Sequence, residues 1–191
     1  MLTPGIYSAY RSGIEALSDN PHAETAAAGL AADGPNQCQT HLFVATARDF
    51  LADENLQAEV FGCASLVVTC ATDAEIHQVA EHLEGQLTAT LHLDEADLDA
   101  ARRLLPTLER KAGRLLVNGW PTGVEVCDAM VHGGPFPATS DARSTSVGTA
   151  AILRFLRPVC YQDFPDSLLP VALQHDNPLH LRRLLDGQRE A

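Results

Sequence analysis

The feature that most constrains the fold is a regular alternation of strand-like and helix-like segments in the middle of the chain. Residues 65–71, 86–93 and 114–119 have strand length and are rich in aliphatic and β-branched side chains, whereas residues 72–85 and 94–113 place apolar side chains at helical spacing. This order is typical of α/β proteins, in which helices connect parallel strands. The segment therefore predicts an α/β fold with a mostly parallel sheet and helices on both of its faces.

Both predicted helices of this alternation carry local features that affect where they begin or end. Thr72 stands where an N-cap residue is expected, and Glu75 follows three positions later, as in a capping box. Pro106 lies inside the second helical segment and is expected to kink or shorten it.

The residues before the alternation predict two helices and one further strand. Residues 4–17 have one apolar helical face, and residues 22–32 predict a second, short helix. Residues 40–46 form a continuous apolar run that is typical of a buried strand. Residues 47–63 are a polar connection of a length that usually has a functional reason.

Three different kinds of segment follow the alternation. Residues 119–143 are rich in Gly, Pro, Ser and Thr and predict a long loop, which is where binding residues often lie. Residues 149–165 are apolar and predict an extended strand. The tail, residues 166–191, is expected to contain a short helix over residues 177–190. We accordingly divide the chain into residues 1–148, the strand 149–165 and the tail.

Composition excludes several classes of function. The chain has 191 residues, with 13 Lys and Arg against 25 Asp and Glu, and hence a net charge of −12. Such a charge disfavours binding to nucleic acid or to an anionic membrane surface. No run of residues is long and apolar enough to span a membrane, and the first residues do not resemble a signal peptide, so we expect a cytoplasmic protein. The five cysteines have neither disulfide-framework nor zinc-site spacing, and we expect no metal.

Residues 115–165, with HGGPFPATSD as their most distinctive part, and the segment Glu59-Val60-Phe61-Gly62 resemble the C-terminal part of the aldehyde dehydrogenase catalytic domain. The likeness is closest to the NADP-dependent branch that includes 2-oxoglutarate semialdehyde dehydrogenase. It implies that residues 1–148 are part of that catalytic domain, and that residues 149–165 form a strand of the kind used for oligomerisation. It also implies oxidation of an aldehyde to a carboxylate through a cysteine thioester, with hydride transfer to NADP or NAD.

The resemblance also implies roles for four residues. Glu59 would accept hydrogen bonds from the nicotinamide ribose hydroxyls, with Phe61 packed near that ribose, whereas His132 and Phe136 would line the entry path of the aldehyde. Chemically, a carboxylate is a suitable acceptor for two vicinal hydroxyls. Taken without the resemblance, Glu59 could equally be a solvated loop carboxylate, Phe61 a core side chain, and the glycine-rich loop a rigid turn. The family commonly has proline where this chain has Cys63, which removes a conformational restraint.

The resemblance assigns no catalytic residue to this chain. In the family, the nucleophilic cysteine, the general base and the dinucleotide-binding fold all precede the matched region, so we expect the isolated chain to be inactive. Two alternatives remain open. In the first, the chain is a non-catalytic interaction module, which pairs with an intact subunit or with a separate N-terminal half. Less favoured is a thiol enzyme that uses Cys127 and His132.

Overall fold

A computed structural model describes residues 1–32, 34–121 and 123–189. The chain divides into two units, residues 1–154 and residues 155–191, and each is described by itself. The first unit contains the helices and strands α1 (Pro4–Ser18), β1 (Glu24–Ala28), β2 (His41–Thr46), α2 (Ala47–Ala52), η1 (Glu54–Gln57), β3 (Ala64–Thr69), α3 (Asp73–His82), β4 (Gln86–Leu91), η2 (Glu95–Asp97), α4 (Leu98–Lys111) and β5 (Ala112–Val117).

The first sheet has the strand order β1-β2-β3. Strands β2 and β3 are parallel, with His41 opposite Ala64 and Thr46 opposite Thr69. Strand β1 pairs antiparallel with β2 and has an irregular register between Thr25 and Ala27. The prediction of a short helix over residues 22–32 is therefore wrong. These residues have good helix propensity, but pairing with β2 satisfies the backbone groups of β1, and tertiary context overrides a weak local preference.

One face of α1 packs on the first sheet and forms the larger of two cores. Tyr10, Ile14 and Leu17 of α1 are buried against Phe43 and Ala45 of β2, together with two residues of the following connection, Phe50 and Leu56. The predicted helix over residues 4–17 is confirmed, and the apolar spacing of its sequence is the spacing of its buried face. Thr3 caps this helix, because its hydroxyl accepts a hydrogen bond from the backbone N–H of Ile6 at 3.2 Å.

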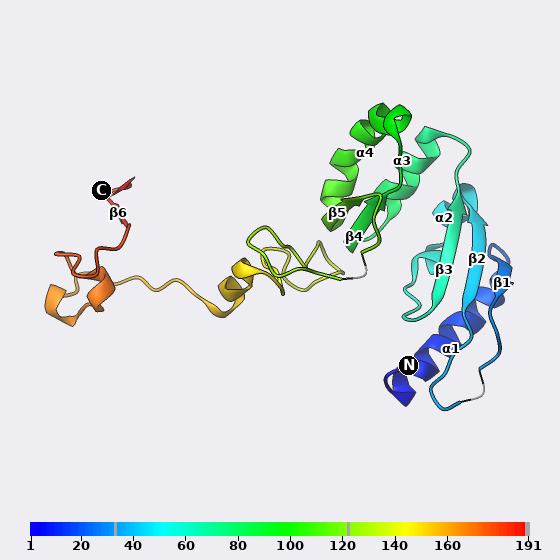
Figure 1. Cartoon of the computed structure of the whole chain (residues 1–191), viewed down its shortest axis with the longest axis horizontal. Coiled ribbons are helices and arrows are strands. Elements are labelled where there is room, and N and C mark those ends of the chain that lie inside the picture. The colour runs from blue at the N-terminus through cyan, green and yellow to red at the C-terminus, as the bar shows by residue number, and fades with distance from the viewer. Residues whose placement is uncertain (33, 122, 190–191) are drawn as a thin grey trace. The chain divides into compact units, whose positions relative to one another are not determined.

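The second sheet pairs β4 with β5 in parallel, and α3 and α4 pack beside it (Figure 1). Its core consists of Ala80, Leu104 and Leu108. The Thr72 hydroxyl caps α3 by accepting from the Glu75 N–H at 3.2 Å, as predicted, whereas the Glu75 carboxylate accepts from the N–H of Ala71 and not from that of Thr72. Helix α4 continues past Pro106 to Lys111 and is not shortened there.

The α/β fold class that the sequence predicts is confirmed. Its parallel strand pairs are divided between two sheets, because β3 is hydrogen-bonded only to β2, and β4 only to β5, among the residues that the structure describes. This division could not be predicted from the alternation of elements alone. No described helix is long and apolar enough to cross a lipid bilayer.

The last part of the chain differs from its predicted secondary structure. Residues 149–165 contain the 3₁₀ helix η3 (Thr149–Phe155) followed by irregular backbone, and no strand. A strand needs a neighbouring strand to pair with, and none of the strands in the described part of the chain pairs with these residues. The prediction of a helix over residues 177–190 is also wrong. Within the described part, β6 (Leu184–Leu185) and β7 (Gln188–Arg189) form a small antiparallel hairpin. Its turn residues, Asp186 and Gly187, have positive φ. Two short 3₁₀ helices, η4 (Asp166–Leu168) and η5 (Val171–Leu173), precede this hairpin.

Candidate functional site

The predicted cofactor-binding residues lie on the short loop between η1 and β3, residues 58–63, which we call the Glu59 loop. Its central residue, Val60, is half-buried and packs against the larger core, close to Gly13 of α1. Glu59 and Phe61 on either side are exposed, and 65% of the Phe61 surface is accessible. Successive side chains of an extended segment point in opposite directions, so burial of Val60 keeps both neighbours at the surface.

The Glu59 carboxylate is exposed and free to accept hydrogen bonds from a ligand. Its carboxylate makes no hydrogen bond or ion pair within the described residues. Both of its oxygens are therefore available to the vicinal hydroxyls of a ribose, and the exposed Phe61 ring offers an apolar surface two residues away. Phe61 is not a core side chain. These residues thus fit the nicotinamide ribose, although their role stays a prediction.

The predicted aldehyde-lining residues lie on the long loop after β5. The backbone N–H of His132 donates to the Thr145 hydroxyl at 2.8 Å, and the His132 carbonyl accepts from the N–H of Ser146 at 3.0 Å. A Cβ atom on Gly113 of β5 would lie 2.1 Å from the carbonyl oxygen of Gly133, so only glycine lets this loop approach the strand so closely. The loop is held against the second sheet by close backbone packing.

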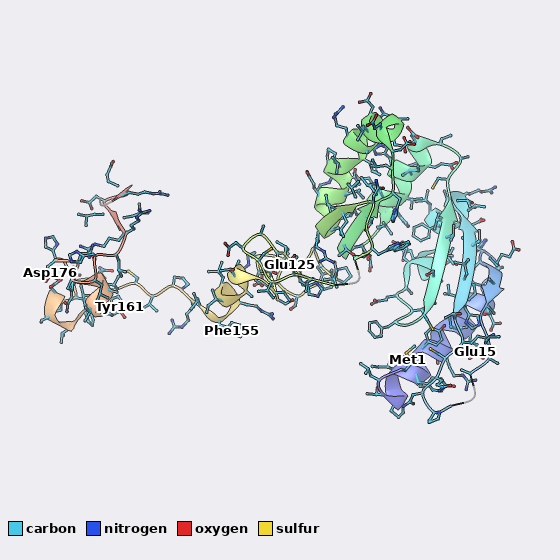
Figure 2. The ribbon with its side chains drawn as sticks, in the orientation of Figure 1. Met1, Glu15, Glu125, Phe155, Tyr161 and Asp176 are labelled. Atoms are coloured by element: carbon cyan, nitrogen blue, oxygen red, sulfur yellow. The ribbon has the colours of Figure 1, made fainter. Side chains whose placement is uncertain are left out.

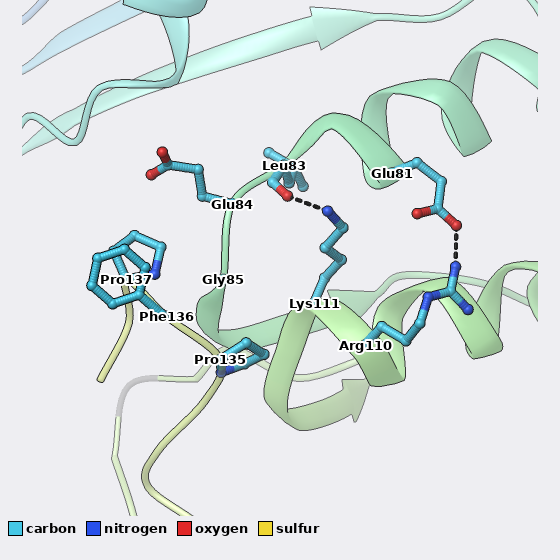
Figure 3. Close-up of a pocket in the computed structure, with 9 residues that line it drawn as sticks. All are labelled: Glu81, Leu83, Glu84, Gly85, Arg110, Lys111, Pro135, Phe136 and Pro137. Carbon is cyan, nitrogen blue, oxygen red and sulfur yellow. Dashed lines mark hydrogen bonds and ion pairs between the residues drawn. The ribbon is translucent and has the colours of Figure 1, made fainter. Parts of the chain in front are cut away.

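Phe136 lines a surface pocket of about 410 Å³ at the ends of α3 and α4 (Figure 3). Its ring is 81% exposed. Three of the four charged side chains of this pocket are engaged: Glu81 contacts Arg110, and the Lys111 ammonium donates to the Leu83 carbonyl at 2.6 Å, whereas the Glu84 carboxylate makes no hydrogen bond or ion pair among the described residues. A hydrogen bond from Thr107, and then the charges of Arg110 and Lys111, keep the pKa of Glu81 below its usual value. Phe136, with Pro135 and Pro137 on either side, gives this pocket one apolar wall.

His132 is half-buried and is not among the residues lining this pocket. Its Nδ1 atom is buried without a hydrogen-bond partner in the described part of the chain. The structure therefore does not bring His132 and Phe136 into one lining surface. No hydrogen bond, ion pair or ring contact between described residues joins either of them to Glu59 or Phe61.

Cys127, the one cysteine that the sequence offers as a nucleophile, is exposed at the edge of a second pocket of about 390 Å³. Its thiol makes no hydrogen bond to His132 or to any other described residue. Nothing in its surroundings therefore activates it through a neighbouring base.

One cluster near the Glu59 loop was not predicted. The thiols of Cys38 and Cys63 are in contact, and the hydroxyl of Tyr10 lies beside them. Cys63 immediately precedes β3 and Cys38 lies three residues before β2, but only the parallel pairing of these two strands brings the cysteines together. Across residues 1–32, 34–121 and 123–189, no group of three or more His, Cys, Asp and Glu side chains is arranged to hold a metal ion.

Comparison with known proteins identifies relatives over the whole chain. No family model matches the sequence. It is 60% identical over 190 residues to "Alpha-ketoglutaric semialdehyde dehydrogenase 2" of Azospirillum brasilense, covering 100% of this chain and 36% of the relative. It is 53% identical to "Alpha-ketoglutaric semialdehyde dehydrogenase" of Acinetobacter baylyi, covering 98% of this chain and 36% of the relative. The chain thus spans little more than a third of the length of the curated relatives that it matches.

Solved structures of aldehyde dehydrogenases share the fold. Delta-pyrroline-5-carboxylate dehydrogenase of Mycobacterium tuberculosis matches with a TM-score of 0.63 and 18% identity over 88% of this chain and 31% of that chain. Betaine aldehyde dehydrogenase of Staphylococcus aureus matches with a TM-score of 0.60 and 16% identity over 81% of this chain and 30% of that chain. The resemblance to aldehyde dehydrogenases that the sequence predicts is confirmed by these matches, as is its partial extent.

Proposed function

We propose that this chain is the C-terminal part of an NAD(P)-dependent aldehyde dehydrogenase that oxidises a semialdehyde, such as 2-oxoglutarate semialdehyde, to the carboxylate. The observation that carries the proposal is 60% identity over the full length of the chain to a protein with that name. Identity at this level supports a shared substrate class, whereas the more distant structural neighbours support the fold alone.

Within such an enzyme, this chain contributes one side of the cofactor site. The Glu59 carboxylate accepts hydrogen bonds from the ribose hydroxyls, and Phe61 packs against the same ribose. Two of the matched structures, the enzymes of Staphylococcus aureus and Mycobacterium tuberculosis, are complexes with NAD. When bound, a nicotinamide cofactor supplies the acceptor for the hydride that the aldehyde loses. NADP is the cofactor that the sequence resemblance favours.

In this proposal, the residues that catalyse the reaction lie in polypeptide outside this chain. We assign no catalytic residue here, because Cys127, the one cysteine that the sequence offers as a nucleophile, lacks a neighbouring base. His132 and Phe136 contribute to the path of the aldehyde, with Phe136 supplying an apolar wall. The purified chain is therefore expected to show no turnover with a semialdehyde and NADP. Turnover that is lost in Cys127→Ser alone would contradict this expectation.

A chimera tests the role of the Glu59 loop. This chain replaces the matching residues of the Azospirillum brasilense relative, and kcat/KM for NADP and for NAD is measured with 2-oxoglutarate semialdehyde. Loss of charge-assisted hydrogen bonds usually costs about 1.5–3 kcal/mol, so Glu59→Gln is expected to lower kcat/KM for the cofactor by roughly 10- to 100-fold.

The matched control is Glu54→Gln, because Glu54 is an exposed carboxylate of the neighbouring helix η1. It is expected to leave kcat/KM unchanged. Equal effects of the two substitutions in an active chimera would refute the role of Glu59. An inactive chimera with a native circular dichroism spectrum would instead contradict the proposed enzyme activity of this chain.

A second candidate function, assembly with another subunit, is favoured by the apolar surface of residues 149–165. Ile152, Leu153, Leu156 and Val159 are each between 57% and 63% exposed, and Phe155 is 80% exposed. Phe155 and Tyr161 mark this segment in Figure 2. Apolar side chains in such number are typical of a protein interface. We propose that the segment pairs with a neighbouring subunit or with a separate N-terminal half.

Size-exclusion chromatography with light scattering tests this assembly. The chain is expected to form a complex with itself or with the N-terminal part of the relative, and Leu153→Asp with Leu156→Asp is expected to abolish it. Leu2→Asp serves as the control, because Leu2 lies outside the segment and is still more exposed than Leu153 and Leu156. A chain that stays monomeric alone and in the mixture contradicts assembly through this segment.

A further inference from the structure

Two cysteines meet where β2 and β3 begin. The Sγ atoms of Cys38 and Cys63 are 3.2 Å apart. A disulfide bond places two sulfurs at about 2.05 Å, so these sulfurs need to approach by little more than about 1 Å. Their backbones are held together by the parallel pairing of the two strands, including a hydrogen bond of 3.1 Å from the His41 N–H to the Cys63 carbonyl.

The packing around Cys63 holds it at this position. The Cys63 thiol lies 3.6 Å from the Tyr10 hydroxyl, which itself donates to the Gln39 carbonyl at 2.6 Å. A Cβ atom on Gly62 would lie 2.4 Å from a ring carbon of Tyr10, so glycine is required for the chain to pass so close to that ring. The buried Tyr10 thereby fixes the backbone on the amino-terminal side of Cys63.

The two thiols differ in ways that assign them different roles in an oxidation. Cys63 is exposed and meets a solute oxidant directly, whereas Cys38 is half-buried behind it. The pKa of Cys38 is raised, first by its hydrogen bond with Cys63 and then by burial, so Cys38 keeps its proton when the first sulfur reacts. Exposed thiols are the ones that oxidants usually reach first.

We propose that Cys38 and Cys63 form a reversible disulfide site that responds to peroxide. The Cys63 thiolate attacks hydrogen peroxide, an S–O bond forms, the O–O bond breaks, and the departing hydroxide is protonated to water. The Cys38 sulfur then attacks the Cys63 sulfenic acid. The S–S bond forms as the S–O bond breaks, and the second hydroxide takes the Cys38 proton and leaves as water. Two thiols and one peroxide thus give one disulfide and two waters.

The arrangement is selective, because no other pair of cysteine thiols is in hydrogen-bonding contact in the described part of the chain. Cys70 is half-buried, and burial raises its pKa. Cys127 and Cys160 are exposed but have no second thiol in contact. Cys63 also directly follows Gly62 of the Glu59 loop, so a disulfide would restrain one end of that loop. This last consequence rests on the proposed function, whereas the disulfide site does not.

The test uses the full 191-residue chain, reduced and then exposed to hydrogen peroxide. Remaining thiols are alkylated under denaturing conditions, and the mass and chymotryptic peptides are measured; cleavage after Leu66 separates Cys63 from Cys70. We expect two thiols to disappear together, a cross-linked peptide pair containing Cys38 and Cys63, and full reversal by dithiothreitol. Because the two sulfurs are already adjacent, conversion of the Cys63 sulfenic acid to the disulfide is expected to be at least about tenfold faster than in the chain unfolded in urea.

Variants separate this site from general thiol oxidation. Cys63→Ser is expected to abolish the disulfide, and Cys38→Ser to leave a Cys63 sulfenic acid that dimedone captures. Cys70→Ser and Cys127→Ser are matched controls that keep the disulfide. A disulfide that persists in Cys63→Ser, oxidation of Cys127 or Cys160 before Cys63, or an equal rate in the folded and unfolded chain would each overturn the proposal. Circular dichroism of every variant confirms that these comparisons are made on folded protein.

Discussion

Removal of one hydroxyl group from the larger core gives the most direct test of how the first sheet is held on α1. The Tyr10 side chain is 2% exposed, and its hydroxyl donates a hydrogen bond of 2.6 Å to the Gln39 carbonyl. The same hydroxyl lies 3.4 Å from the Cys63 carbonyl. Tyr10→Phe keeps the ring and its packing and removes only this link between α1 and the residues that precede β2 and β3.

The expected loss follows from the groups left behind. A hydrogen bond contributes about 0.5–1.5 kcal/mol net, and an acceptor that is buried without a partner costs about 1–3 kcal/mol. The Gln39 carbonyl is only half-buried, and His41 Nδ1 lies 3.2 Å from it as an alternative donor. We therefore expect Tyr10→Phe to lower the free energy of unfolding by about 1–2 kcal/mol, which corresponds to roughly 2–8 °C in Tm.

Urea unfolding followed by circular dichroism at 222 nm, a standard helix wavelength, measures this difference. Tyr7→Phe is the matched control, because Tyr7 lies on the same helix, is half-buried, and its hydroxyl makes no hydrogen bond within the described residues. It is expected to change the free energy of unfolding by less than about 0.5 kcal/mol. If Tyr10→Phe unfolds at the same urea concentration as Tyr7→Phe, the hydroxyl does not stabilise this core and the reasoning is refuted.

Two further predictions concern the second sheet and its helices. The folded chain lowers the pKa of Glu81, chiefly through the 2.9 Å hydrogen bond from Thr107, so the ionised carboxylate stabilises the fold above its unfolded pKa of about 4.3, and this contribution is lost as the pH falls. Glu81→Gln should therefore be less stable than wild type in urea at pH 7, with a gap that closes toward pH 3; an equal gap at both pH values contradicts this. Thr72→Ala should cost about 1 kcal/mol by removing the cap of α3, whereas Thr72→Ser should cost less, and equal losses in thermal unfolding would contradict a capping role.

Local features of the sequence predict most of the helices and central strands. Helices α1, α3 and α4 are predicted by the spacing of their apolar residues, and α3 also by its cap residue Thr72, because these features depend on residues within one or two turns. Strand β1 is missed because its conformation depends on β2, more than ten residues away in the sequence. Residues 149–165 form no strand within this chain, and their pairing with a strand of another subunit stays a prediction.

The candidate site is only partly accessible to sequence reasoning. The residue types at Glu59 and Phe61 suit a ribose, but the resemblance to a family is what singles them out from other loop residues. Their exposure follows from the burial of Val60, which the sequence does not specify. The contact between Cys38 and Cys63 depends on the register of β2 against β3, and cysteine spacing along the chain carries no information on that register.

The two edges of the first sheet are not equivalent. At one edge, the irregular register between Thr25 and Ala27 interrupts the hydrogen-bonding pattern of β1, which disfavours continuation by an incoming strand. At the other edge, β3 pairs with β2 in an unbroken register from Ala64 to Thr69 and has no second neighbour among the described residues. Of the two edges, β3 therefore offers the more regular hydrogen-bonding pattern to an added strand.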